Sequence, residues 1–223
     1  IDVAIRRNVK KIVALSTDKA CNPINLYGAT KLASDKLFVS ANLDTINSDT
    51  CFSVVRYGNV LGSRGSVIPF FQAKAKTGVF TITDKRMTRF MITIEQGVKL
   101  GWRALEDMLG GEIYVYKIPS MKVTDIARAI NQDACHEIIG IRPGEKIHEV
   151  MISQEDSLNS YEYDWYYKIL PSLNNWHIDP ERIKDGKKVE PGFIYSSGSN
   201  EEWMKIEQLQ DFLGSDQYRE LQD

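Results

Sequence analysis

Short apolar runs and amphipathic stretches alternate through the first part of the chain. Nearly continuous apolar runs cover residues 11–16 and 51–57. Runs of this kind are typical of parallel strands that are buried on both faces. Between them, apolar residues recur with a helical period over residues 27–42. The pattern therefore predicts strand, helix and strand in succession, with a polar loop at 42–50.

Weaker patterns predict further elements beyond residue 60. A capping box at residues 93–96 predicts a helix that ends before Gly110. One face of that helix is apolar and carries Val98, Trp102, Leu105 and Leu109. Other expected elements are strands at 80–83, 112–118 and 137–141 and a short helix at 124–130. Alternating strands and helices indicate an α/β protein with a doubly wound parallel sheet.

The composition is that of an ordinary globular protein, with 43% hydrophobic and 26% charged residues and a net charge of -2. This balance gives no support for nucleic acid or a membrane surface as a partner. No apolar run approaches the ~20 residues of a membrane span. Cys21, Cys51 and Cys135 cannot all pair, and we interpret them as reduced cytosolic thiols. The three histidines lack ligand spacing, so we expect no metal site.

Candidate catalytic residues gather between the first predicted strand and the first predicted helix. Thr17, Asp18 and Lys19 follow the strand at its carboxyl end, where open α/β sheets bind ligands. Tyr27 and Lys31 are four residues apart on the helix and share a face. A lysine ammonium near a phenol stabilises tyrosinate, so this pair suits proton transfer with a hydroxyl group.

A plainer interpretation exists for each half of this cluster. Taken alone, Tyr27 and Lys31 fit a surface pair on an amphipathic helix, and Asp18 and Lys19 fit a salt-bridging turn. The shared location of the two pairs at one strand end favours a catalytic site.

Five segments carry a resemblance to a known family. They are residues 16–42, 52–71, 83–93, 111–126 and 138–152. These segments resemble the extended short-chain dehydrogenase/reductase family and, within it, the nucleotide-sugar 4,6-dehydratases. The likeness is greatest to the inverting branch that converts UDP-N-acetylglucosamine at the start of pseudaminic acid synthesis.

The resemblance implies a lyase that removes water from UDP-N-acetylglucosamine, with NADP as a cofactor that is regenerated. It implies that Tyr27 is the base on the C4 hydroxyl, that Lys31 binds the nicotinamide ribose, and that Thr17 hydrogen-bonds the C4 oxygen. Lys19 is expected to remove the C5 proton. Asp18 is expected to protonate the departing C6 hydroxyl.

The resemblance also implies contacts away from the reacting sugar. A cofactor contact is implied at Val60. Substrate contacts are implied at Lys19, Asn59, Arg64, Gly65, Ser66, Val67, Ile68, Arg89, Arg142, Glu145 and Tyr195. Arginine suits bidentate contact with phosphate. Arg56, beside a buried strand, is expected to form a structural ion pair instead.

The resemblance sets the expected domain organisation. Residues 1–60 would form the second half of a dinucleotide-binding Rossmann domain. Residues 61–223 would form mainly a substrate domain, interleaved with the first, and a tail whose aromatic residues pack against that domain or a neighbouring subunit. The sequence contains no G-x-G-x-x-G, so we expect the glycine-rich N-terminal half to be missing. The family also implies a cytoplasmic homo-oligomer.

Three other functions remain open at this point. A nucleotide-sugar epimerase or simple oxidoreductase needs only Tyr27 and Lys31 and leaves Asp18 and Lys19 without a role. A retaining 4,6-dehydratase would use the same residues without inversion at C5. An inactive, truncated fragment would fit the missing glycine-rich half.

Overall fold

The computed structural model describes residues 1–45 and 49–221, and these divide into two compact units that alternate along the chain. Unit 1 contains Ile1–Tyr57, Glu95–Lys117 and Val150–Tyr195. Unit 2 contains Gly58–Ile94, Ile118–Glu149 and Ser196–Asp223. The boundary expected near residue 60 is the first of several crossings between the units. Residues 46–48 of the loop expected at 42–50 lie outside the described residues.

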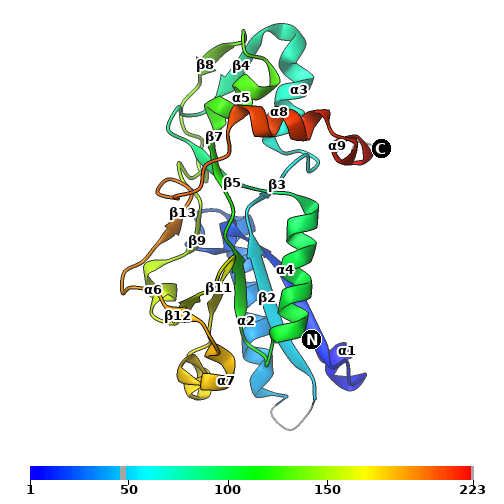
Figure 1. Cartoon of the computed structure of the whole chain (residues 1–223), viewed down its shortest axis with the longest axis vertical. Helices are drawn as coiled ribbons and strands as arrows, with labels where there is room; N and C mark the ends of the chain where they lie inside the picture. The colour runs from blue at the N-terminus through cyan, green and yellow to red at the C-terminus, as the bar shows by residue number, and fades with distance from the viewer. Residues whose placement is uncertain (46–48, 222–223) are drawn as a thin grey trace. The chain divides into compact units, whose positions relative to one another are not determined.

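Unit 1 is built around a six-stranded sheet in the order β1-β2-β6-β11-β10-β12 (Figure 1). Three of these strands are parallel: β1 (Lys11–Thr17), β2 (Cys51–Tyr57) and β6 (Ile113–Tyr116). The other three extend the sheet in antiparallel fashion: β11 (Tyr166–Ile169), β10 (Ser160–Glu162) and β12 (Lys187–Lys188). The parallel part confirms the expected α/β fold.

The aromatic segment after residue 160 packs differently from the prediction. Tyr166 and Tyr167 belong to β11, which pairs with β6 of the same sheet, and both side chains are buried. Trp165 packs on Tyr116 with ring centroids 5.0 Å apart. The expected packing of these residues against the second domain is therefore wrong, because strand pairing places them in unit 1.

Two long helices accompany the parallel strands. The helix α2 (Leu26–Ser40) packs against β1 and β2. The helix α4 (Ile94–Asp107) buries Leu100 and Ala104. The apolar face that the sequence marks on α4 is not the buried one, since Trp102 is 63% exposed and Val98 and Leu109 are exposed as well.

Shorter elements complete unit 1. They are α1 (Asp2–Arg6), η1 (Asp18–Ala20), η2 (Ala41–Leu43), β9 (Val150–Ile152), α6 (Gln154–Ser157), η4 (Leu173–Ile178) and α7 (Pro180–Ile183), with β13 (Tyr195–Ser196) at the boundary with unit 2.

Unit 2 contains two small sheets and four helices within its described residues. The sheets are β3-β5-β7, from β3 (Asn59–Val60), β5 (Thr88–Ile92) and β7 (Ser120–Lys122), and β4-β8, from β4 (Val79–Ile82) and β8 (Cys135–Ile138). The helices are α3 (Val67–Lys74), α5 (Val123–Ile130), α8 (Ile206–Gly214) and α9 (Asp216–Glu220), with the short turn η3 (Ala75–Thr77).

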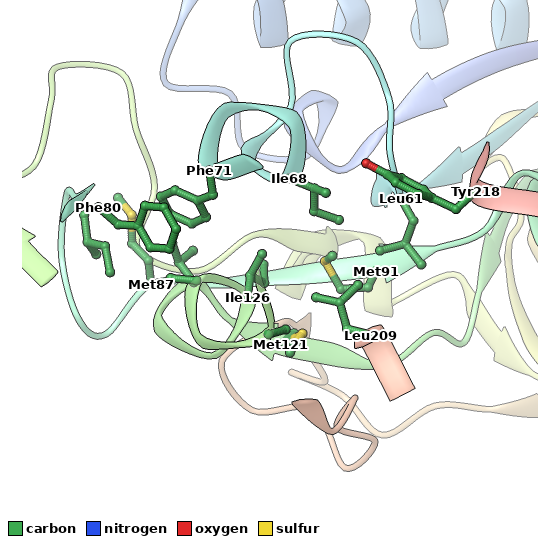
Figure 2. Close-up of a cluster of buried hydrophobic side chains, with 14 residues drawn as sticks. Leu61, Ile68, Phe71, Phe80, Met87, Met91, Met121, Ile126, Leu209 and Tyr218 are labelled. Carbon is green, nitrogen blue, oxygen red and sulfur yellow. The ribbon is translucent and has the colours of Figure 1, made fainter. Parts of the chain in front are cut away.

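The core of unit 2 joins segments that are distant in sequence. Figure 2 shows Phe71 and Phe80 packed together from α3 and β4, with ring centroids 4.9 Å apart. Leu209 and Tyr218, from the last two helices, lie in the same cluster as Leu61. The C-terminal segment is thus part of the hydrophobic core of unit 2.

A buried ionic network lies inside unit 1. The carboxylate of Asp107, at the end of α4, accepts hydrogen bonds from Lys168 Nζ at 2.6 Å, Lys184 Nζ at 2.5 Å and the hydroxyl of Tyr114 at 2.8 Å. The side chains of Asp107 and Lys168 are each only 1% exposed. The network ties α4 and β6 to the antiparallel strands, because its members come from both regions.

We expect the stability of the chain to depend on the ionisation of Asp107. Burial by itself would raise the pKa of Asp107, but the bonds from Lys168 and Lys184 outweigh it and lower the pKa to about 2 from 3.8. A depressed carboxyl pKa contributes stability above the unfolded-state value and loses it as the pH falls through the folded-state value. About 2 kcal/mol of unfolding free energy should therefore disappear between roughly pH 4 and pH 2.

Urea unfolding between pH 2.5 and pH 6 would measure this effect. Asp107→Asn should be less stable at pH 6 and should lack that part of the pH dependence. Asp216→Asn is the control, because Asp216 is exposed on α9 and pairs with Arg219, which is exposed as well. Equal pH slopes for wild type and Asp107→Asn would contradict the prediction.

Candidate active site

The end of β1 positions three polar side chains in sequence. Thr17 ends the strand and caps the turn η1, since its Oγ1 accepts the Lys19 backbone N–H at 3.3 Å. The same hydroxyl donates to Asp18 Oδ1 at 2.9 Å. Lys19 Nζ donates to that oxygen at 3.0 Å. Asp18 Oδ1 therefore accepts hydrogen bonds from both the hydroxyl of Thr17 and the ammonium of Lys19.

The second carboxylate oxygen of Asp18 is in a different situation. Asp18 is 0% exposed, and its Oδ2 is buried with no hydrogen-bond partner among the described residues. An unsatisfied buried acceptor costs free energy, and such groups concentrate where a ligand completes the bonding. This oxygen can therefore accept a hydrogen bond from a hydroxyl group of a ligand.

The first turn of α2 lies directly against this strand end. A Cβ at Gly28 would come within 2.3 Å of the Lys19 carbonyl oxygen and 2.9 Å of Pro23 Cβ. Glycine is required here because the two backbones approach so closely. Asn25 begins the helix by accepting the Gly28 N–H on its side chain at 2.8 Å.

Tyr27 and Lys31 project from this helix as the sequence predicts. The phenol of Tyr27 is reachable from solvent, since the residue is 54% exposed. Lys31 Nζ donates to the backbone oxygen of Leu15, in β1, at 2.9 Å. An ammonium has three donors, so this bond holds Lys31 against the strand and leaves donors for a ligand diol. Lys31 can therefore contact adjacent hydroxyl groups of a ligand.

Two residues at the end of β2 support this site. Burial, and to a smaller degree the neighbouring Tyr27, raises the pKa of Tyr57 above its ordinary value, so Tyr57 stays a neutral phenol. Arg56 donates to the Met151 carbonyl oxygen at 2.7 Å and pairs with Asp156 at 3.1 Å and Asp35 at 3.3 Å. The structure confirms that Arg56 forms a structural ion pair. Tyr57 was missed, although its place at a parallel strand end is the signal that identified Thr17.

Unit 2 holds a separate cavity of about 250 Å³. Seven of the expected substrate residues line it: Asn59, Gly65, Ser66, Val67, Arg89, Arg142 and Glu145. Other lining residues were not predicted, namely Phe70, Phe71, Thr81, Ile82, Thr83, Met87 and Val123. Thr81 and Thr83 flank the buried Ile82 on an expected strand, so period-2 alternation could have identified them.

The polar groups of this cavity are of two kinds. Arg89 and Arg142 supply positive charge. Asn59 Oδ1, Ser66 Oγ and Glu145 Oε2 are buried without hydrogen-bond partners among the described residues. A matching ligand combines an anionic group for the arginines with N–H or O–H donors for the acceptors.

Four expected ligand residues lie elsewhere. Ile68 belongs to the hydrophobic core of unit 2 and is 1% exposed, so only its backbone can meet a ligand. Arg64 is exposed and does not line the cavity. Tyr195 is buried in unit 1 against Tyr167, with ring centroids 5.2 Å apart. Val60 is partly buried in β3.

A larger cavity, of about 690 Å³, lies in unit 1 against the second half of α2 and the start of β6. Its lining includes none of the candidate catalytic residues, since it lies at the amino end of the parallel strands. Among the described residues, no His, Cys, Asp and Glu cluster has the arrangement of a metal site. No helix of the described part is long and apolar enough to span a membrane.

A parallel α/β sheet with Tyr27 and Lys31 beside a polar strand end defines the extended short-chain dehydrogenase/reductase class, as the sequence resemblance indicates. Residues 1–171 match the family described as Polysaccharide biosynthesis protein, and the chain belongs to this family.

Individual relatives agree with this assignment. The UDP-N-acetylglucosamine 4,6-dehydratase (inverting) of Campylobacter jejuni is 53% identical over an aligned length of 222 residues, and the match covers 96% of this chain and 66% of that protein. The UDP-glucose 4-epimerase of Rickettsia conorii is 35% identical over 218 residues, 96% of this chain and 64% of that protein. The X-ray structure of Pen from Bacillus thuringiensis matches with a TM-score of 0.84 and 34% identity, covering 97% of this chain and 66% of that one. This chain thus spans just under two thirds of these relatives.

Gly28→Ala tests the close approach of α2 to the strand end. We expect a loss of about 1–3 kcal/mol in unfolding free energy, because the new methyl group meets a backbone oxygen that cannot move away cheaply. Gly101→Ala, inside α4, is the matched control, since its Cβ would meet nothing within 4 Å. That control should be neutral or more stable, by up to about 1 kcal/mol. Similar urea midpoints for both variants would exclude a steric role for Gly28.

Proposed function

We propose that the protein to which this chain belongs is a UDP-N-acetylglucosamine 4,6-dehydratase of the inverting type. The product would be UDP-2-acetamido-2,6-dideoxy-β-L-arabino-hexos-4-ulose. The observation that carries the proposal is the cluster at the end of β1, where Asp18 Oδ1 binds both Thr17 and Lys19 and Asp18 Oδ2 is left for a ligand. The 53% identity to a dehydratase of this specificity supports it.

The proposed chemistry begins at C4 of the sugar. Tyr27 removes the proton of the C4 hydroxyl, and Thr17 hydrogen-bonds the same oxygen. Lys31 binds the nicotinamide ribose and stabilises tyrosinate. A nicotinamide dinucleotide, when bound, supplies the hydride acceptor for C4 and the hydride donor for C6. NADP is the form proposed here, and Val60 is proposed as a further contact to it.

Elimination follows because the C4 ketone acidifies the C5 proton. At this step Lys19 acts as a neutral amine and Asp18 as a neutral carboxylic acid. Lys19 removes the C5 proton, and Asp18 protonates the C6 hydroxyl, which leaves as water. The buried Oδ2 of Asp18 is the natural position for the transferred proton, since Oδ1 already accepts two bonds. Addition of a proton to the opposite face of C5 gives the inverted configuration, and a bound dinucleotide would supply the hydride for C6.

The cavity of unit 2 is proposed to bind the nucleotide end of the substrate. Arg89 and Arg142 would contact the diphosphate. Glu145 and Asn59 would accept hydrogen bonds from hydroxyl or N–H groups of the nucleotide. The loop at residues 64–68 and Tyr195 remain proposed contacts. A cytoplasmic location and a homo-oligomer also belong to this proposal.

The first experiment is the reaction itself, carried out with the full-length protein. Incubation with UDP-N-acetylglucosamine in deuterated water should give a 4-keto-6-deoxy sugar with deuterium at C5 and the L-arabino configuration by NMR. Lys19→Ala should lower kcat by at least about 100-fold, because a general base typically contributes 10²–10⁴.

The controls separate the dehydratase from its alternatives. Lys36→Ala, on the same helix as Tyr27 but exposed, should leave the rate unchanged. A sugar that changes only at C4 would identify an epimerase and remove the roles of Asp18 and Lys19. Deuterium at C5 with the original configuration would identify a retaining enzyme.

A further inference from the structure

Arg89 in unit 2 is held on two of its three nitrogen atoms by the protein itself. Its Nη1 donates to the backbone oxygens of Thr88 at 2.7 Å and Ile147 at 3.2 Å. Its Nε lies 3.8 Å from a carboxylate oxygen of Glu149. Among the described residues, the only hydrogen-bond acceptor that Nη2 contacts is the sulfur of Met87, at 3.7 Å. The Nη2 edge is therefore the edge that remains for a ligand.

Glu149 is unusual among the charged groups around this cavity. It is 3% exposed and does not line the cavity. Its carboxylate lies between two cations, Arg89 at 3.8 Å and Lys146 at 4.0 Å. A buried carboxylate is costly unless nearby charges compensate it, so the position of Glu149 and that of Arg89 depend on each other.

The backbone around Glu149 is also fixed. Its N–H donates to Ser197 Oγ at 2.9 Å, and Ser197 Oγ lies 2.7 Å from the hydroxyl of Thr88. Ser197 and Thr88 are both buried. Because Thr88 precedes Arg89 in β5, this bond couples the backbone that carries Glu149 to the backbone that carries Arg89.

We infer that Glu149 is a positioning residue, which holds the guanidinium of Arg89 so that its Nη2 edge meets the diphosphate of a nucleotide. This inference rests on the proposed nucleotide site of unit 2. Glu149 does not touch the ligand. Its carboxylate orients the guanidinium of Arg89 through Nε and compensates part of the positive charge of this largely buried guanidinium.

Binding of UDP and uridine to the full-length protein, measured by calorimetry, tests the inference. Uridine lacks the diphosphate, so it reports the fold of the cavity without the contact that Arg89 makes. Glu149→Gln keeps the shape and removes the charge. This substitution should weaken UDP binding about tenfold and leave uridine binding unchanged. A loss of this size is typical when a residue that orients a ligand-binding side chain is removed from a metal site.

The dependence on Arg89 is measured with a double-mutant cycle. Arg89→Met should weaken UDP binding, and adding Glu149→Gln to it should cause no further loss. A structural role for Glu149 would instead weaken uridine binding as well and add to the effect of Arg89→Met. Glu207→Gln, an exposed carboxylate on α8, is the matched control and should bind both ligands like wild type.

The outcomes distinguish the two levels of the proposal. If wild type binds UDP no more tightly than uridine, the proposed nucleotide site fails, and the inference fails with it. If wild type prefers UDP but Glu149→Gln binds it equally well, or loses uridine to the same extent, only the inference is overturned. If Glu149→Gln does not fold, Glu149→Asp replaces it in the double-mutant cycle with Arg89→Met. Glu149→Asp keeps the charge on a shorter side chain, so we expect a smaller loss of UDP affinity.

Discussion

The close contact between α2 and the backbone of Lys19 is the constraint on which the candidate active site depends. Parallel pairing of β1 and β2 fixes the strand end, but it does not by itself bring the next helix near. The absence of a side chain at Gly28 allows the helix to start directly beside the turn. Tyr27 and Lys31 are then set by helical geometry one turn apart, and Lys31 donates to the Leu15 carbonyl oxygen in the strand that ends in Thr17.

The two units provide different kinds of chemistry. Unit 1 supplies groups that can move protons, and they are attached to regular elements whose positions the sheet determines. Unit 2 supplies a small cavity with fixed positive charge and unsatisfied acceptors, which suits recognition. Under the proposed function, one substrate carries a reacting sugar at one end and an anionic nucleotide at the other.

The sequence predicted well the elements that local pattern determines. The bounds expected for β2 were correct, and those of β1 and α2 differ from the prediction by one or two residues. The buried face of α4 was assigned wrongly, because an apolar stripe records hydrophobicity but not which neighbour covers it. The residues of β10 and β11 were not recognised as strands, since β11 pairs with β6, which is about 50 residues earlier, and β10 in turn pairs with β11. No local pattern links positions that are far apart in the sequence. Family resemblance was therefore the basis for predicting substrate contacts at Asn59, Arg89, Arg142 and Glu145.

The alternation of the two units along the chain has a consequence for synthesis on the ribosome. The sheet of unit 1 cannot gain β11 until residues 166–169 have emerged, and by then most of unit 2 has already been made. Asp107, at the end of α4, is synthesised some 60 residues before Lys168, so its carboxylate lacks that partner until β11 has been made. The hydrophobic core of unit 2 is likewise incomplete until Leu209 and Tyr218 have been synthesised. Each unit therefore lacks some of its residues until part of the other unit has been synthesised. A nascent chain that stalls near residue 150 exposes the incomplete hydrophobic cores of both units at once.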